Sequence, residues 1–201
     1  MFTCIYSALI IIAGCTHLWE QLLTVSNAGG DGTFTQYVTV SPSDPISKIP
    51  TGWSYNQAAA VPLVALTAFA CLDWLPSATA KDCKRRVIVS GASGGVGTWC
   101  AQLAKKLYNC HVTGICSGSN ASFVRQLGAD EIVDYTKVDV AKTLLEGRPE
   151  GRKYDLYIDC VGGVEMFKHW VRSRYGTVYV DVLIDIARPS SQKRRLRNHS
   201  R

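Results

Sequence analysis

The sequence predicts an α/β protein that contains a doubly wound parallel sheet. From residue 86 onward, short runs rich in Val, Ile and Tyr alternate with segments of helical character, which is the pattern of repeated strand–helix–strand units. The first run is apolar throughout rather than alternating, as expected for a strand covered on both faces. The chain has 201 residues, of which 47% are hydrophobic and 19% charged, so it is long enough to bury a core.

The N-terminal part carries weaker signals. Residues 2–15 are apolar but too few to span a bilayer, which takes ~20 residues, and they lack the positive residues that begin a signal peptide. We expect a buried strand there or sequence from a displaced start site, because the lipoprotein-type box that ends at Cys15 has no Lys or Arg before it. Residues 33–40 alternate with period two and predict a strand, whereas the prolines in residues 41–52 predict a loop.

Helix and strand signals follow one another regularly after this loop. Ser54 and Gln57 have the spacing of a capping box, which predicts a short helix through residue 61. Pro62 separates this helix from an apolar helix over about residues 63–75. The predicted strands then cover residues 86–90, 111–116, 131–135, 154–160 and 176–181. The predicted helices between them cover residues 96–107, 121–127, 138–146 and 164–174.

A glycine-rich turn directly follows the strand over residues 86–90. Its first glycine allows a tight turn, its middle pair removes side chains where backbone would approach a phosphate, and its last glycine lets the next helix pack close to the sheet. The start of that helix offers free N–H groups and the positive end of the helix dipole. This arrangement predicts a Rossmann-type dinucleotide site, the alternative being a glycine turn without a ligand. The expected diphosphate-binding residues are Gly91, Ser93, Gly94, Gly95, Val96 and Gly97.

The second strand of this unit favours NADP(H) over NAD(H). A site for NAD usually has an acidic residue at the end of this strand, which binds the ribose 2′-hydroxyl. Residues 98–129 contain no acidic residue, and the strand is followed by Ser117, Ser119 and Asn120, whose small polar side chains suit a 2′-phosphate. Arg125 offers a positive charge one turn into the next helix. Helix capping is an alternative role for Ser119 and Asn120.

Charge and cysteine usage argue against a nucleic-acid-binding, membrane-associated, disulfide-bonded or metal-binding protein. The net charge of +6 comes from six basic residues in the last fourteen, and the remaining 16 basic residues balance the 16 acidic ones. We interpret residues 183–201 as a solvated basic tail, and expect neither a nucleic-acid nor a membrane partner; binding of RNA or a membrane surface by this tail is the alternative. None of the 8 cysteines forms a CxxC pair, which indicates a reducing compartment without disulfides, a cytoplasmic location and no metal site.

Residues 30–163 resemble a known family. The motifs are Gly32-Thr-Phe-Thr-Gln-Tyr-Val38, Ala58-Ala-Ala-Val-Pro-Leu-Val-Ala-Leu-Thr-Ala68, Val89-Ser-Gly-Ala-Ser-Gly-Gly-Val-Gly97, Leu127-Gly-Ala-Asp130, Val133-Asp-Tyr135 and Asp159-Cys-Val-Gly-Gly163. Together they resemble the medium-chain dehydrogenase/reductases, in the zinc-independent branch of quinone oxidoreductases and enoyl reductases. The resemblance implies NADPH-dependent hydride transfer to an enone, enoyl or quinone substrate, and it allows a homodimer.

The resemblance also implies roles for single residues. Thr67 would lie near the nicotinamide, Gly162 near the nicotinamide ribose, and Tyr135 beside the adenosine. It would place Ser93 to Val96 at the diphosphate, and Ser117, Ser119 and Asn120 around the 2′-phosphate, although relatives often carry Arg or Lys near the position of Ser119. No catalytic residue follows from it, because this chemistry belongs to the cofactor.

The chain departs from the family at both ends. Members carry a GroES-like substrate domain before the strand over residues 33–40, and a last strand of the sheet after residue 181. We therefore expect a remnant of the substrate domain in residues 1–53, a Rossmann domain in residues 54–182 and the tail in residues 183–201. On this interpretation the chain is truncated at both ends, and the alternative function is that of an inactive nucleotide-binding remnant.

Overall fold

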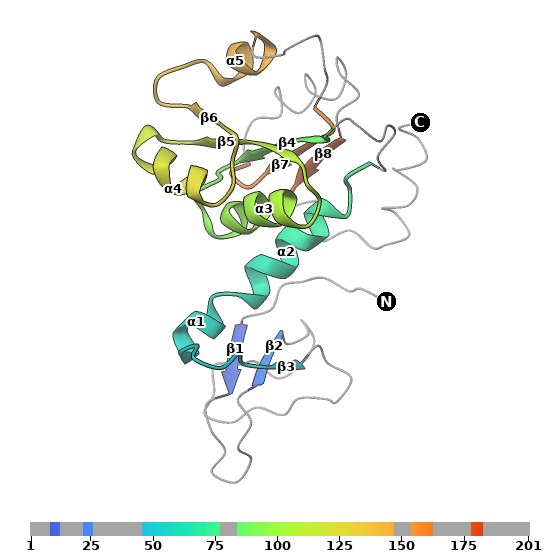
Figure 1. Cartoon of the computed structure of the whole chain (residues 1–201), viewed down its shortest axis with the longest axis vertical. Coiled ribbons are helices and arrows are strands. Elements are labelled where there is room, and N and C mark those ends of the chain that lie inside the picture. Colours follow the sequence, from blue (N-terminus) through green and yellow to red (C-terminus); the bar gives the residue numbers. More distant parts are fainter. Residues whose placement is uncertain are drawn as a thin grey trace.

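The described part of the chain contains two sheets in the computed structural model, one antiparallel and one parallel (Figure 1). The structure describes residues 9–12, 22–25, 46–76, 84–146, 154–162 and 178–182. The strand predicted over residues 33–40, the helix predicted over residues 164–174 and the basic tail lie outside these ranges.

The smaller sheet is antiparallel and contains β1 (Leu9–Ile12), β2 (Leu22–Val25) and β3 (Ile46–Lys48) in that order. The strand expected within residues 2–15 is confirmed by β1. The loop predicted over residues 41–52 was wrong in part, because residues 46–48 pair with β2. Strands of three or four residues are too short to show a period in the sequence, and pairing with a distant segment decides their conformation.

Two helices lead from the small sheet to the large one (Figure 1). In α1 (Tyr55–Ala59) the predicted capping box is present: the Ser54 N–H donates to Gln57 Oε1 over 2.8 Å, and the Gln57 N–H donates to Ser54 Oγ over 3.2 Å. Pro62 is the first residue of α2 (Pro62–Leu72), where a missing N–H costs no hydrogen bond.

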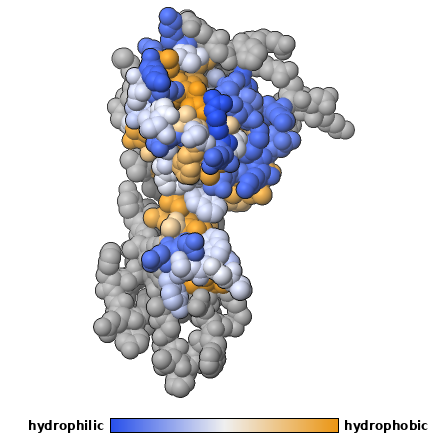
Figure 2. Space-filling view, turned by 60° about the vertical axis from the view of Figure 1, so that its left-hand side comes forward, coloured by the Kyte–Doolittle hydropathy of each residue, from blue (hydrophilic) through white to orange (hydrophobic). Residues whose placement is uncertain are grey.

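The helix α2 is apolar on nearly every side. Its inner side belongs to the core, while Leu66 and Phe69 are 44% and 48% exposed. In Figure 2 the junction between the lower and upper parts of the molecule is correspondingly apolar. Among the described residues, one stretch, Tyr55–Leu72, is long and apolar enough to cross a membrane. Core helices of soluble proteins also meet this criterion, so it is weak evidence for a membrane span.

The larger sheet is parallel and has five strands in the order β6-β5-β4-β7-β8. It confirms the predicted Rossmann-like, doubly wound architecture, since the chain runs outward from β4 to β6 and then returns to the other side of β4. The strands are β4 (Arg86–Ser90), β5 (His111–Cys116), β6 (Glu131–Asp134), β7 (Leu156–Asp159) and β8 (Val178–Asp181). They match the predicted runs to within two residues at either end.

Helices cover both faces of this sheet. On one face, α3 (Gly95–Lys106) and α4 (Ala121–Gln126) pack with α2 over the residues of the main core. On the other face, α5 (Val140–Glu146) places Leu144 among Tyr154, Tyr157 and Tyr179. Successive strands are added on one side of β4 as far as β6 and on the other side from β7 onward, so the direction reverses between the neighbouring strands β4 and β7. This reversal creates a crevice at the carboxyl ends of these two strands.

An ion pair ties the far end of α3 to the sheet. Lys105 Nζ donates to Asp130 Oδ1, and Asp130 Oδ2 accepts the Val112 N–H over 2.8 Å. Burial opposes ionisation of Asp130, but these hydrogen bonds outweigh it and hold the pKa of its carboxyl below the usual range.

Candidate functional site

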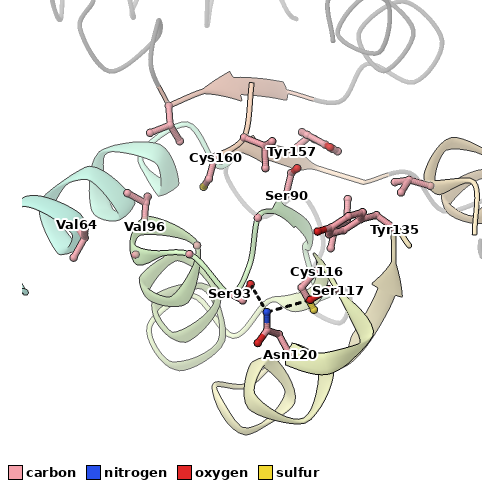
Figure 3. Close-up of a pocket in the computed structure, with 18 of the residues that line it drawn as sticks. Val64, Ser90, Ser93, Val96, Cys116, Ser117, Asn120, Tyr135, Tyr157 and Cys160 are labelled. Carbon is pink, nitrogen blue, oxygen red and sulfur yellow. Dashed lines mark hydrogen bonds between the residues drawn. The ribbon is translucent and has the colours of Figure 1, made fainter. Parts of the chain in front are cut away.

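A cavity of about 990 Å³ lies in the crevice at the carboxyl ends of the parallel strands. It is bounded by the glycine turn, the segment after β5, the start of α5 and the end of β7 (Figure 3). Its size falls at the upper end of the range usual for small-molecule sites, and its lining is predominantly apolar.

The glycine turn forms the floor of this cavity. Gly91 has a φ of +69°, a left-handed conformation that glycine adopts without strain. The turn is closed by a hydrogen bond from the Gly94 N–H to the Gly91 carbonyl over 2.9 Å. Gly94 is the N-cap residue of α3, and no side chain makes a capping hydrogen bond to this helix. The first N–H groups of α3 therefore lack a side-chain partner, and the residues that carry them line the cavity. An anion is the natural partner for such a helix start.

Three glycines of the turn differ in what a side chain would meet. A Cβ at Gly97 would stand 2.1 Å from the Gly91 carbonyl oxygen, so this position needs glycine for helix–strand packing. A Cβ at Gly95 would lie 3.2 Å from Val64 Cγ1, and one at Gly94 would meet only the Gly91 oxygen, at 3.2 Å. A Cβ at Gly94 would thus require a shift of only a few tenths of an ångström from the Gly91 carbonyl, at a residue that lines the cavity.

Polar side chains link the glycine turn to the segment after β5. Asn120 Nδ2 donates to Ser93 Oγ over 3.3 Å and to Ser117 Oγ over 3.2 Å, as Figure 3 shows. Ser117 Oγ also lies 3.0 Å from Ser119 Oγ. The side chain of Asn120 makes no capping hydrogen bond to α4. It instead connects the glycine turn to the segment after β5. The resulting group of hydroxyls is neutral and can donate to an anion.

An acidic residue near this segment was missed in the sequence. Asp134 ends β6 and pairs in register with Cys116 at the end of β5. Its carboxylate accepts the Thr136 hydroxyl over 2.7 Å and the Gly118 N–H, and Lys137 Nζ lies 3.7 Å away. The hydrogen bond from Thr136 contributes most to keeping the pKa of Asp134 below its usual range. Residues 98–129 do lack acidic side chains, as the sequence shows. The parallel sheet nevertheless places the carboxylate of Asp134, from the next strand, beside the end of β5.

Two stacked tyrosines lie on neighbouring strands, and one of them, Tyr157, lines the other end of the cavity. The rings of Tyr157 and Tyr179 are parallel within 10° with centroids 5.2 Å apart. The Tyr157 hydroxyl is hydrogen-bonded to Ser90, and burial raises the pKa of Tyr157 well above its usual value. The Tyr179 hydroxyl donates to Asp159 Oδ2. Asp159 Oδ1 accepts the N–H of Gly162 over 3.0 Å and thereby holds the turn after β7.

The cavity lining includes most of the residues predicted from the sequence, but three lie outside it. Thr67 is only 7% exposed and lies within α2, from which Val64 reaches the cavity instead. Ser119 and Gly162 flank lining residues. The predicted residues that line the cavity are Gly91, Ser93, Gly94, Gly95, Val96, Gly97, Ser117, Asn120 and Tyr135.

Sequence reasoning missed the apolar wall that completes the cavity. Val140 and Ala141 come from the start of α5, and Tyr157, Cys160 and Val161 from the end of β7. The rule that ligands bind beyond the carboxyl ends of parallel strands would have identified Cys160 and Val161, since they lie at the end of the fourth predicted strand.

No metal site is found in the described ranges, where no three His, Cys, Asp or Glu side chains gather closely enough to hold an ion. The residues described here therefore do not fit zinc, and no step of the chemistry considered below involves it.

Comparison with known proteins finds relatives of this chain. The family model described as zinc-binding dehydrogenase matches residues 95–185. A mitochondrial protein of Bos taurus, NAD(P)H oxidoreductase RTN4IP1, is 34% identical over 164 residues, which are 78% of this chain and 40% of that protein. The trans-enoyl reductase pgmF of Aspergillus terreus is 37% identical over 155 residues, covering 75% of this chain and 40% of that protein.

A solved structure agrees with these relatives. A quinone oxidoreductase of Pseudomonas syringae pv. Tomato DC3000 superposes with a TM-score of 0.60 at 27% identity, over 77% of this chain and 44% of that one. The chain thus spans about 40% of the length of the curated relatives it matches. The order of strands, the glycine turn at the start of α3 and these likenesses support membership of the medium-chain dehydrogenase/reductase family.

Proposed function

We propose that the chain binds NADPH in the cavity and serves an NADPH-dependent reductase of the quinone or enoyl type. The observation that carries this proposal is the uncapped start of α3 at a glycine-rich turn that lines a cavity of about 990 Å³. Peptide N–H groups and the helix dipole at this point suit a diphosphate, and the cavity extends to both sides of it for the two nucleoside halves.

The preference for NADPH over NADH rests on the segment after β5. Ser117 and Asn120 line the cavity there, and Ser119 lies within 3.0 Å of Ser117. Lys137 lies next to this segment, because its Nζ is 3.7 Å from the position that a Cβ on Gly118 would occupy. The Lys137 side chain is 77% exposed, so it is free to turn toward a 2′-phosphate. Lys137 also offsets the charge of Asp134, which would otherwise repel that phosphate.

The remaining residues would position the two halves of the cofactor. Tyr135 is 60% exposed and lines the end of the cavity that we assign to the adenosine. The turn after β7, held by Asp159, would support the nicotinamide ribose near Gly162. Bound nicotinamide supplies the hydride, and the apolar wall of Val140, Val161 and their neighbours would exclude water from it. We assign no catalytic residue.

The names of the relatives suggest the substrate class, a quinone or an enoyl compound. We further propose that residues 54–182 are the cofactor domain and residues 1–53 part of a substrate domain. A second candidate function is nucleotide binding without turnover, and it is favoured by one observation: the described residues that line the cavity include none to which we assign a catalytic role.

Two measurements on the 201-residue chain separate these possibilities. Calorimetric titration with NADPH and with NADH tests binding, and we expect NADPH to bind more tightly. Oxidation of NADPH, followed by absorbance with 1,4-benzoquinone or a short enone, tests turnover. Binding with turnover supports the reductase, and binding without turnover supports the second candidate. Failure of both nucleotides to bind would refute the proposal.

A further inference from the structure

A buried carboxylate joins two neighbouring strands of the parallel sheet at the edge of the cavity. Asp159 ends β7 and Tyr179 lies in β8, and the two residues are only 7% and 4% exposed. The Tyr179 hydroxyl donates to Asp159 Oδ2. Asp159 Oδ1 accepts the N–H groups of Val161 and Gly162, each over 3.0 Å. One carboxylate therefore connects β8 to the turn that follows β7.

The hydroxyl of Tyr179 is a reliable donor to this carboxylate. A carboxylate taken out of water needs hydrogen-bond donors, because burial disfavours an unpartnered charge. Burial, followed by the hydrogen bond to Asp159 and the charge of that residue, raises the pKa of Tyr179 far above its usual value, so the phenol keeps its proton. The ring that carries the hydroxyl is stacked on Tyr157, with the two planes within 10° of each other. Tyr179 is thus suited to orient the Asp159 side chain.

The turn held by Asp159 forms part of the cavity wall beside the glycine turn. Val161 lines the cavity, and its Cγ2 lies 2.9 Å from the position that a Cβ on Gly91 would occupy. Gly162 follows with a φ of +76°, a left-handed conformation that the hydrogen bond to Asp159 helps to fix. A displacement of the Asp159 carboxylate would therefore move the wall relative to the first glycine of the floor.

We propose that Tyr179 is a positioning residue for the nicotinamide half of the cofactor, acting through Asp159 on the turn of Val161 and Gly162. This inference rests on the proposed function, which assigns Gly162 to the nicotinamide ribose. The adenosine half is assigned to other elements, such as Tyr135 after β6. Loss of the Tyr179 hydroxyl should therefore loosen one end of the site and leave the other end unchanged.

Amide hydrogen exchange followed by NMR, without cofactor, tests the link from Tyr179 to the turn. In the parent chain the amides of Val161 and Gly162 should be protected, although Val161 is 66% exposed. Tyr179→Phe keeps the ring against Tyr157 and removes only the hydroxyl, so both amides should exchange at least about threefold faster. Tyr154→Phe is the matched control and should exchange as the parent does. Tyr154 belongs to the same buried cluster but precedes β7, at the end of the strand away from the cavity.

Calorimetry tests the effect on the cofactor, with two ligands that differ only in the nicotinamide half. The ligands are NADPH and 2′-phosphoadenosine 5′-diphosphate, the part of NADPH that lacks the nicotinamide riboside. Tyr179→Phe should weaken NADPH binding about fivefold, because a hydrogen bond to a charged group is lost behind the turn, and should leave binding of the fragment unchanged. Tyr154→Phe should bind both ligands as the parent does. A merely structural role of Tyr179 would weaken both ligands equally.

The inference is overturned if Tyr179→Phe leaves the exchange of Val161 and Gly162 unchanged, if these amides are unprotected in the parent, or if NADPH and the fragment are affected equally. Failure of the parent to bind NADPH would refute the proposed function and the cofactor part of this inference together. The exchange measurement distinguishes the two cases, since it shows whether Tyr179 holds the turn when no nucleotide is present.

Discussion

Replacement of Gly97 by alanine should destabilise the fold despite alanine's higher helix propensity. Within a helix, alanine is favoured over glycine by about 1 kcal/mol. The new Cβ would, however, stand 2.1 Å from the Gly91 carbonyl oxygen and 2.8 Å from Ala92 Cα, whereas ordinary contacts begin at 3.4 Å. Both obstacles are backbone atoms of the turn, so neither can move aside by rotating a side chain.

The size of the effect follows from the balance of these two terms. Overpacking in a closely packed region costs about 1–3 kcal/mol, and a clash with backbone belongs at the upper end. After the gain in propensity, Gly97→Ala should lower the free energy of unfolding by about 2 kcal/mol, or the melting temperature by roughly 4–8 °C.

Urea denaturation followed by circular dichroism measures this difference, with Gly94→Ala as the matched control. A Cβ at Gly94 meets only one atom, at 3.2 Å, and a poorer N-cap residue should lower stability by about 1 kcal/mol or less. If Gly97→Ala proved as stable as Gly94→Ala or the parent, the close approach of α3 to the turn would be refuted.

Three other substitutions test the helix cap, the ion pair and the charge beside the cavity. Ser54→Ala removes the capping box of α1 and should lower the free energy of unfolding by about 1 kcal/mol in urea; no change would mean that the cap contributes nothing. Lys105→Met removes a partner that depresses the pKa of Asp130. A carboxyl whose pKa is depressed by folding stabilises the folded state at pH values above its unfolded-state pKa. This stabilisation is lost as the pH falls through the pKa of the carboxyl in the folded state. The variant's deficit, about 0.5–1 kcal/mol at pH 7, should therefore shrink toward pH 2, and a deficit independent of pH would contradict the assignment. Lys137→Ala should weaken NADPH binding about threefold in calorimetry and leave NADH binding unchanged, with the exposed Lys106→Ala as control; equal losses for both nucleotides would argue against contact with a 2′-phosphate.

The parallel sheet was predictable because each of its strands carries its own signal. Residues 86–90 form an apolar run ended by glycine, and they are a strand in the structure over the same bounds. The capping box at Ser54 was equally local, since its two hydrogen bonds join residues three apart in sequence. Local chemistry decides such elements, and the alternation of strands and helices then restricts the topology.

Features that depend on contacts between distant segments were not predictable in this way. The strand at residues 46–48 exists through pairing with β2, and its proline-rich surroundings favoured a loop. Asp134 was overlooked because it is distant in sequence from Gly118, although register places it at the neighbouring strand end.

The central claim is that bare peptide groups of the glycine turn hold the diphosphate of the cofactor. Isothermal calorimetry of NADPH binding to the parent chain and to Gly94→Val tests it most directly, because Gly94 lines the cavity and a Cβ at this position would meet only the Gly91 oxygen, at 3.2 Å. We expect the variant to keep the circular dichroism spectrum of the parent and to lose NADPH affinity by at least about tenfold, or 1.4 kcal/mol. A folded Gly94→Val variant that binds NADPH as tightly as the parent would contradict the account.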